Sequence, residues 1–168
     1  MQFEITHEFD IPLDALELAV ISPDLMGKLA QRLPNIESVQ QKEHQLVGKR
    51  VERVCGYRAN VRLPAFAKAY VTPEMMGWDE RSTYEIDKHR SEWTIVPHVK
   101  PSWRKYFAAS GTYALTELAS GRTKRTVHGS VELRVPVFSK VAEKLIVGEV
   151  RKTFDAEAET LKELATLV

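Results

Sequence analysis

The sequence has a single cysteine, Cys55, among 168 residues. One thiol excludes an internal disulfide, so we expect a reducing, cytoplasmic compartment and a packing role for Cys55. The first residues lack the basic start and apolar core of a secretory signal. No stretch approaches the ~20 apolar residues that a membrane-spanning helix needs, so we expect at most transient contact with a membrane.

The sequence also lacks an excess of either charge, since 24 basic and 23 acidic residues give a net charge of +1. Nucleic-acid-binding proteins usually carry an obvious basic excess, so we expect no nucleic-acid partner. The basic run at residues 122–125 is interpreted as a solvated hairpin turn, with contact to an anionic partner as the alternative.

Motifs of known chemistry are missing as well. The five histidines show no metal-ligand spacing, and no nucleophile elbow, phosphate-binding loop or dinucleotide fingerprint occurs. We therefore predict no metal, no cofactor and no catalytic residue, and expect binding rather than catalysis. The sequence indicates nothing about oligomeric state.

What is present predicts one domain spanning residues 1–168, because 43% hydrophobic and 28% charged residues are ordinary for a globular protein of this size. Alternation predicts a first strand at 3–9, and apolar spacing with proline breaks predicts short helices at 13–20 and 23–33. A long helix follows the last proline, from about residue 139 to 167. Further strands are predicted at 36–45, 47–57, 81–87, 90–99, 105–118 and 123–135, and their short connections indicate an antiparallel sheet.

Small residues on the inward side of two strands, Ala109, Gly111 and Gly129, predict unfilled volume inside the sheet. His7 shares parity with inward Phe3 and should also point inward. Gly148 interrupts the long helix, which indicates either close packing against the sheet or a gap that a ligand fills.

Residues 58–80 are too long for a hairpin turn and too apolar for a plain loop, which predicts a lid. Because successive hairpins alternate ends of a sheet, this segment should lie beside the turns at 100–104 and 135–138. Together they would form the mouth of a cavity, made of Met75, Met76, Trp78, Trp103 and Phe138. The alternative is that both tryptophans fold inward as core.

The order of one strand, two short helices, six antiparallel strands and a long C-terminal helix resembles the helix-grip fold of the START-like superfamily, which includes birch-pollen-allergen relatives and polyketide cyclases. The segment Phe9 to Val39 and the motifs Gly111-Thr112-Tyr113 and Val135-Pro136-Val137-Phe138 resemble a bacterial branch of it. The resemblance implies an α+β fold in which a seven-stranded antiparallel sheet wraps around the C-terminal helix. It also implies a cavity between the two for lipids, polyketides or other hydrophobic molecules.

Three functions follow as hypotheses. The first is binding of a hydrophobic small molecule or lipid, the second a cyclase- or lyase-like enzyme of the same fold, and the third a protein-interaction module with a filled core. An enzyme would need converging titratable groups, for which only His7 and Arg53 are candidates. The predicted ligand-binding residues are Trp93, Phe107, Tyr113, Leu115, Val131, Leu145, Gly148, His7, Arg53 and Tyr57.

Overall fold

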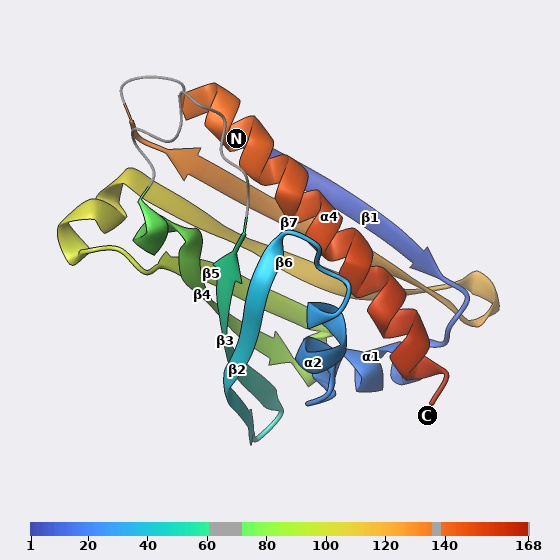
Figure 1. Ribbon diagram of the computed structural model, residues 1–168. Helices are drawn as coiled ribbons and strands as arrows, with labels where there is room; N and C mark the ends of the chain where they lie inside the picture. The colour runs from blue at the N-terminus through green and yellow to red at the C-terminus, as the bar shows by residue number, and fades with distance from the viewer. Residues whose placement is uncertain (61–71, 136–138, 168) are drawn as a thin grey trace.

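A computed structural model describes residues 1–60, 72–135 and 139–167 and shows one antiparallel sheet of seven strands crossed by one long helix (Figure 1). The strands lie in the order β1-β7-β6-β5-β4-β3-β2. They are β1 (Gln2–Phe9), β2 (Ile36–Val47), β3 (Arg50–Ala59), β4 (Gly77–Glu85), β5 (Arg90–Pro97), β6 (Phe107–Leu118) and β7 (Arg122–Leu133). The helices are α1 (Leu13–Ile21), α2 (Leu25–Ala30) and α4 (Ser139–Ala165). Short 3-10 helices occur at η1 (Pro73–Met76), η2 (Ile86–Lys88), η3 (Pro101–Tyr106) and η4 (Ala119–Gly121). The predicted helix-grip architecture is confirmed.

Helix α1 begins at the predicted residue and ends one residue later, whereas α2 is shorter than predicted, since it begins at Leu25 instead of Pro23 and ends at Ala30 instead of residue 33. Pro12 precedes the first turn of α1, where its missing N–H costs no hydrogen bond, and Ser22 follows the last residue of that helix. The chain leaves α2 shortly before Pro34. Helix α4 spans 27 residues and ends two residues before the predicted position.

Strand β4 begins at Gly77, four residues before the predicted start. Trp78 therefore belongs to a strand rather than a loop: it pairs in register with Tyr57 on β3, and the two rings stack with centroids 5.5 Å apart. The prediction missed this strand start because the inward positions 80 and 82 carry glutamate and serine, which hide the apolar alternation. The middle of the predicted lid, residues 61–71, lies outside the described residues.

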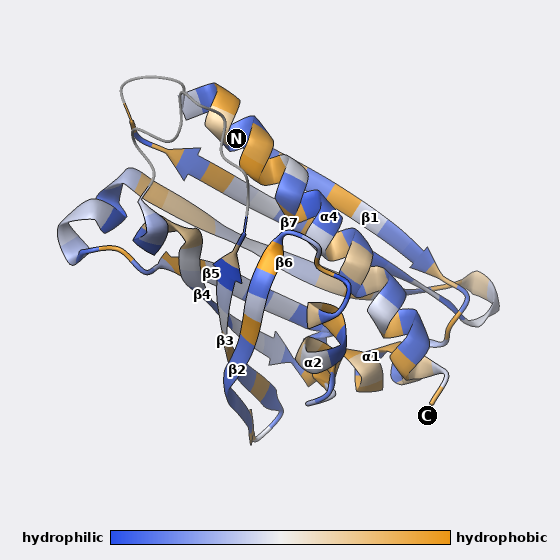
Figure 2. Ribbon diagram, viewed as in Figure 1, coloured by the Kyte–Doolittle hydropathy of each residue, from blue (hydrophilic) through white to orange (hydrophobic). Residues whose placement is uncertain are grey.

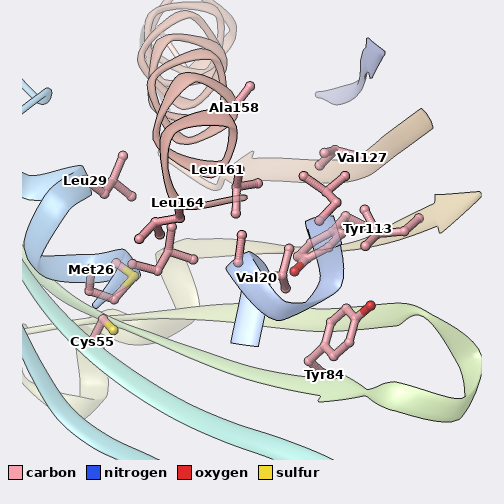
Figure 3. Packing of buried hydrophobic residues seen from close by; sticks show 14 of the residues in the cluster. Val20, Met26, Leu29, Cys55, Tyr84, Tyr113, Val127, Ala158, Leu161 and Leu164 are labelled. Atoms are coloured by element: carbon pink, nitrogen blue, oxygen red, sulfur yellow. The ribbon is translucent and has the colours of Figure 1, made fainter. Parts of the chain in front are cut away.

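The larger core cluster fills the end of the sheet where α1, α2 and the C-terminal half of α4 meet. Leu161 and Leu164 point from α4 toward the two short helices, and Tyr84 and Tyr113 rise from the sheet below them (Figure 3). A second cluster lies on the sheet under the N-terminal half of α4 and consists of Trp93, Ala109 and Val131 with surrounding, partly buried apolar side chains. The hydropathy colouring of α4 alternates accordingly along its length (Figure 2).

The glycines inside the sheet do not leave empty space above them, which corrects the sequence-based expectation. A Cβ at Gly111 would lie less than 3.0 Å from the Trp93 ring, and a Cβ at Gly129 would lie less than 3.0 Å from the Phe3 ring. These two aromatic rings stack with centroids 6.4 Å apart. Glycine is used here because a flat ring lies directly on the strand backbone.

Candidate functional site

Most of the predicted ligand-binding residues line the inner face of the sheet. Trp93 and Val131 belong to the second core cluster with partly buried Phe107 beside them. Tyr113 and Leu115 are buried in the larger cluster, at the end that α1 covers. The predicted lining is thus divided between two clusters, and only the cluster under the N-terminal half of α4 is remote from the short helices.

Two predicted residues lie on α4 itself. Leu145 is 54% exposed, and a Cβ added at Gly148 would meet no atom within 4 Å. Gly148 is itself exposed, so the open space beside it is the outer surface of α4, and sheet backbone does not pack against it. The neighbouring Ile146 and Val147 face the second core cluster instead.

His7 and Arg53, the candidate acid–base pair, belong to different sites. His7 Nε2 lies 2.9 Å from Asp155 Oδ1, and its Nδ1 lies 3.3 Å from Arg125 Nη2. Burial is the largest cause that lowers the pKa of His7. Arg53 instead donates from Nη2 to the Val20 carbonyl oxygen at 2.9 Å and from Nε to His44 at 3.4 Å. The structure does not bring this pair together.

Arg125 is fully buried, so the interpretation of residues 122–125 as a solvated turn is wrong for this residue. Its Nη1 donates to Glu157 Oε2 at 2.6 Å and its Nη2 to the Phe154 carbonyl oxygen at 2.8 Å. The guanidinium also faces the Phe9, Tyr113 and Phe154 rings at 5.5–5.9 Å. Arg125 alternates in step with inward-facing Val127 along β7, which would have indicated its burial. The neighbouring basic residues favoured a solvent-exposed turn instead.

Glu80 is the inner-face residue that sequence reasoning missed. It shares a cross-strand row with buried Cys55 on β3 and with Ile95 on β5, and alternates with Trp78 and Tyr84 along β4. The pKa of its carboxyl is raised to about 7, first by burial and then by the negative charge of Glu157, while Arg53 acts in the opposite direction. Its side chain nevertheless keeps part of its surface accessible.

The groups around Glu80 have shifted pKa values in the same sense. Burial raises the pKa of the Cys55 thiol to about 12, which makes it a poor nucleophile. Burial also raises the pKa of Tyr57 and Tyr113, and the charge of Glu80 or Glu157 adds to both shifts. Near pH 7 the two tyrosine hydroxyls are therefore neutral, and the Glu80 carboxyl is divided between its neutral and its ionised form.

The predicted mouth residues lie at one end of the sheet, together with the N-terminus of α4 (Figure 1). Met75 and Met76 are half-buried in η1, and Trp103 in η3 is 48% exposed. Trp78 is half-buried, packs against the larger core and lies one inward position from Glu80. Phe138 lies outside the described residues.

A surface depression of about 350 Å³ lies elsewhere, at the hairpin between β2 and β3. Its lining is mostly charged: Val47, Lys49, Arg50, Glu52, Glu85, Asp87 and Lys88. This composition does not suit a hydrophobic ligand.

Two tests for other kinds of site give negative results within residues 1–60, 72–135 and 139–167. No group of three or more histidine, cysteine, aspartate or glutamate residues is placed to hold a metal ion. No helix is both long and apolar enough to cross a membrane.

Solved structures share this fold at low sequence identity. A protein of Thermus thermophilus superposes with a TM-score of 0.64 at 15% identity, covering 99% of this chain and 98% of that one. The Zhui aromatase/cyclase from Streptomyces sp. R1128 gives a TM-score of 0.66 at 15% identity, covering 99% and 93%. Norcoclaurine synthase from Thalictrum flavum gives 0.64 at 15% identity, covering 99% and 87%. These likenesses show the helix-grip fold alone.

Sequence comparison with curated proteins finds no match. A family model described as a protein of unknown function, DUF2505, matches residues 4–164, nearly the whole of the chain. This chain is a member of the DUF2505 family.

Proposed function

We propose that the protein binds a hydrophobic small molecule or lipid between the sheet and α4. One observation carries the proposal: Glu80 lies half-buried on the inner face, in a row with Cys55 and Ile95, and has no partner for its carboxyl among the described residues. A carboxyl group in that position requires adjacent space, because a fully enclosed one would need a partner.

The proposed lining combines apolar surface with few polar groups, as small-molecule sites usually do. The apolar body of the ligand would contact Trp93, Phe107 and Val131 on the sheet and the α4 residues that face them, Ile146 and Val147. The approach would pass Met75, Met76 and Trp78, since these residues lie at the end of β4 nearest to Glu80.

Native mass spectrometry of the purified protein tests the binding function. We expect an adduct that organic extraction removes, because an apolar pocket is costly to leave empty of ligand. Adding the identified ligand at 100 times its Kd should raise the free energy of unfolding by about 2.7 kcal/mol. If no adduct forms and no fatty acid, sterol or polyketide stabilises the protein, the interaction-module hypothesis replaces this one.

A pair of helix variants locates the pocket relative to α4. Gly148 is exposed, so Gly148→Ala adds one methyl group and Gly148→Leu a larger side chain without a steric clash in the protein. If the ligand contacts this position, the leucine variant should bind more weakly while the alanine variant binds as the wild type does. Equal binding by all three proteins would remove Gly148 from the pocket.

A second candidate function is acid–base catalysis in the same space, and the two interior carboxyl groups favour it. The pKa of Glu80 is raised to about 7, while Glu157 forms an ion pair with buried Arg125. Carboxyl groups in such different environments can take opposite roles in proton transfer. One structural neighbour is a cyclase, and norcoclaurine synthase has been solved with dopamine and hydroxybenzaldehyde.

Deuterium exchange at the carbon beside the carbonyl group of an aromatic ketone would test for this activity by NMR. An enzyme of this kind should accelerate exchange, and Glu80→Gln should abolish the acceleration. Binding of the ketone without any acceleration would leave the protein as a binding protein.

We also propose a cytoplasmic location, from the single, buried cysteine, and contact with membranes only while ligand is exchanged. Cell fractionation with an antibody to the protein tests both. A stable membrane fraction would contradict the second proposal.

A further inference from the structure

The inner face of β4 carries the features from which a more specific ligand class follows. Trp78, Glu80, Ser82 and Tyr84 alternate toward α4, so polar and aromatic positions share one face. The Tyr57–Trp78 stack lies on the mouth side of Glu80, and its rings are nearly parallel, with an interplanar angle of 9°. A ligand that enters at this end meets aromatic surface first and Glu80 next.

The Glu80 carboxyl has no hydrogen-bond donor and no cation within 4.0 Å among the described residues. The two interior cations are committed elsewhere: Arg53 to the Val20 carbonyl oxygen and Arg125 to Glu157. Buried polar groups are normally satisfied, so the unpartnered carboxyl of a half-buried residue suggests that its partner is an external molecule.

A second polar group on the same face is also unpartnered. The indole N–H of Trp93, a side chain that is only 7% exposed, has no acceptor among the described residues. Trp93 pairs with Ser82, the inward neighbour of Glu80 on β4. The indole ring leans over Gly111 on β6, on the side of β5 away from β4, so this N–H lies apart from the Glu80 carboxyl. Glu80 alone therefore marks the polar end of the proposed pocket.

The charges here select the chemistry of the ligand. The Glu80 carboxylate accepts hydrogen bonds from hydroxyl and amino groups, and Glu157 adds a second negative charge within its electrostatic range. A ligand with a carboxylate at its buried end would place a third negative group here. Among the described residues no free cation lies close enough to pair with it, so its burial would cost free energy.

We propose that Glu80 anchors the buried end of an otherwise apolar ligand through a hydroxyl or amino group, and that ligands with an anionic end are rejected. This inference rests on the proposed binding function and narrows its ligand class to long-chain or aromatic alcohols and amines. It separates the protein from fatty-acid carriers, whose ligands end in a carboxylate.

Three probes that share one body test the end-group preference: 1-dodecanol, dodecylamine and dodecanoate. Each displaces the neutral dye Nile red from the protein, and the fluorescence decrease gives its Kd. We expect the wild type to bind the alcohol and the amine at least tenfold more tightly than the carboxylate, a difference of about 1.4 kcal/mol. Equal or tighter binding of dodecanoate by the wild type would overturn the inference without any variant.

Glu80→Gln keeps the size of the side chain and removes its charge, so it should reduce the preference to less than about threefold, mainly through tighter binding of dodecanoate. Glu92→Gln is the matched control, because Glu92 lies exposed on the neighbouring strand β5 and faces outward. The control should keep the wild-type preference. An unchanged preference in Glu80→Gln refutes the anchor alone, whereas failure of Nile red and of all three probes to bind refutes the proposed binding function with it.

Discussion

Replacing Glu80 by glutamine should change how the stability of the protein depends on pH. The carboxyl pKa is raised from 4.5 to about 7 in the folded protein. A raised carboxyl pKa means that the folded state binds the proton more tightly than the unfolded state. The contribution of Glu80 to stability is therefore most favourable below pH 4.5, falls between pH 4.5 and about 7, and stays reduced at higher pH. Glutamine cannot ionise, so the variant escapes this loss.

The size of the effect follows from the shift. A rise from 4.5 to about 7 corresponds to about 3 kcal/mol if each pKa unit is worth about 1.36 kcal/mol. The accessible surface of Glu80 allows solvent to screen its charge, which reduces the expected effect to about 1–3 kcal/mol. The stability of Glu80→Gln relative to the wild type should rise by this amount between about pH 4 and pH 8.

Urea unfolding at half-unit pH intervals, followed by circular dichroism, measures the difference directly. His7 and His44, whose pKa values are both lowered, titrate in both proteins and cancel from the comparison. Glu92→Gln, at an exposed position of β5, is measured in parallel as the control for the glutamate-to-glutamine change itself. A flat curve for Glu80→Gln would refute the burial of an unpartnered carboxyl group at this position.

Three further changes test the surrounding structure. Arg125→Met should cost about 3–5 kcal/mol of stability, measured by urea unfolding, because it leaves Glu157 without its ion-pair partner. Gly111→Ala should lower stability by about 1–3 kcal/mol, because its methyl group would lie less than 3.0 Å from a backbone carbonyl oxygen. Gly148→Ala should instead raise stability by up to about 1 kcal/mol, since a helical glycine is replaced without a clash, and thermal melting of both variants measures the contrast. Cys55 should resist iodoacetamide in the folded protein at about pH 8 and react after unfolding, since burial raises its pKa to about 12.

The sequence predicts the fold because the main elements have strong local signals. The 27-residue helix α4 follows from an apolar stripe without proline, and the predicted bounds of β6 and β7 lie within two residues of the observed ones. Where the local pattern is ambiguous, pairing with a strand distant in sequence determines the bounds of a strand. The local pattern assigns Trp78 to a loop, although the partner strand β3 extends β4 to include it in the sheet.

The interior charges are less predictable than the fold, and for a different reason. A glutamate or arginine in a strand pattern usually faces solvent, so residue type favours the surface for Glu80 and Arg125. Their burial depends on partners distant in sequence: Glu157 on α4 reaches Arg125, and the neighbouring strands hold Glu80 on the inner face. Only the assembled sheet and helix show these contacts.

Arg125 and Glu80 differ in whether the surrounding protein compensates the burial of their charge. Arg125 is enclosed by a carboxylate, a carbonyl oxygen and three aromatic rings, so its burial is compensated within the protein. Glu80 has no comparable partner among the described residues, and its raised pKa means that ionising it costs stability. Replacement of Glu80 by an apolar residue would be expected to stabilise the fold, so folding alone does not account for a glutamate here. We infer that the proposed ligand satisfies this carboxyl, and the end-group preference measured with the three dodecyl probes tests that inference.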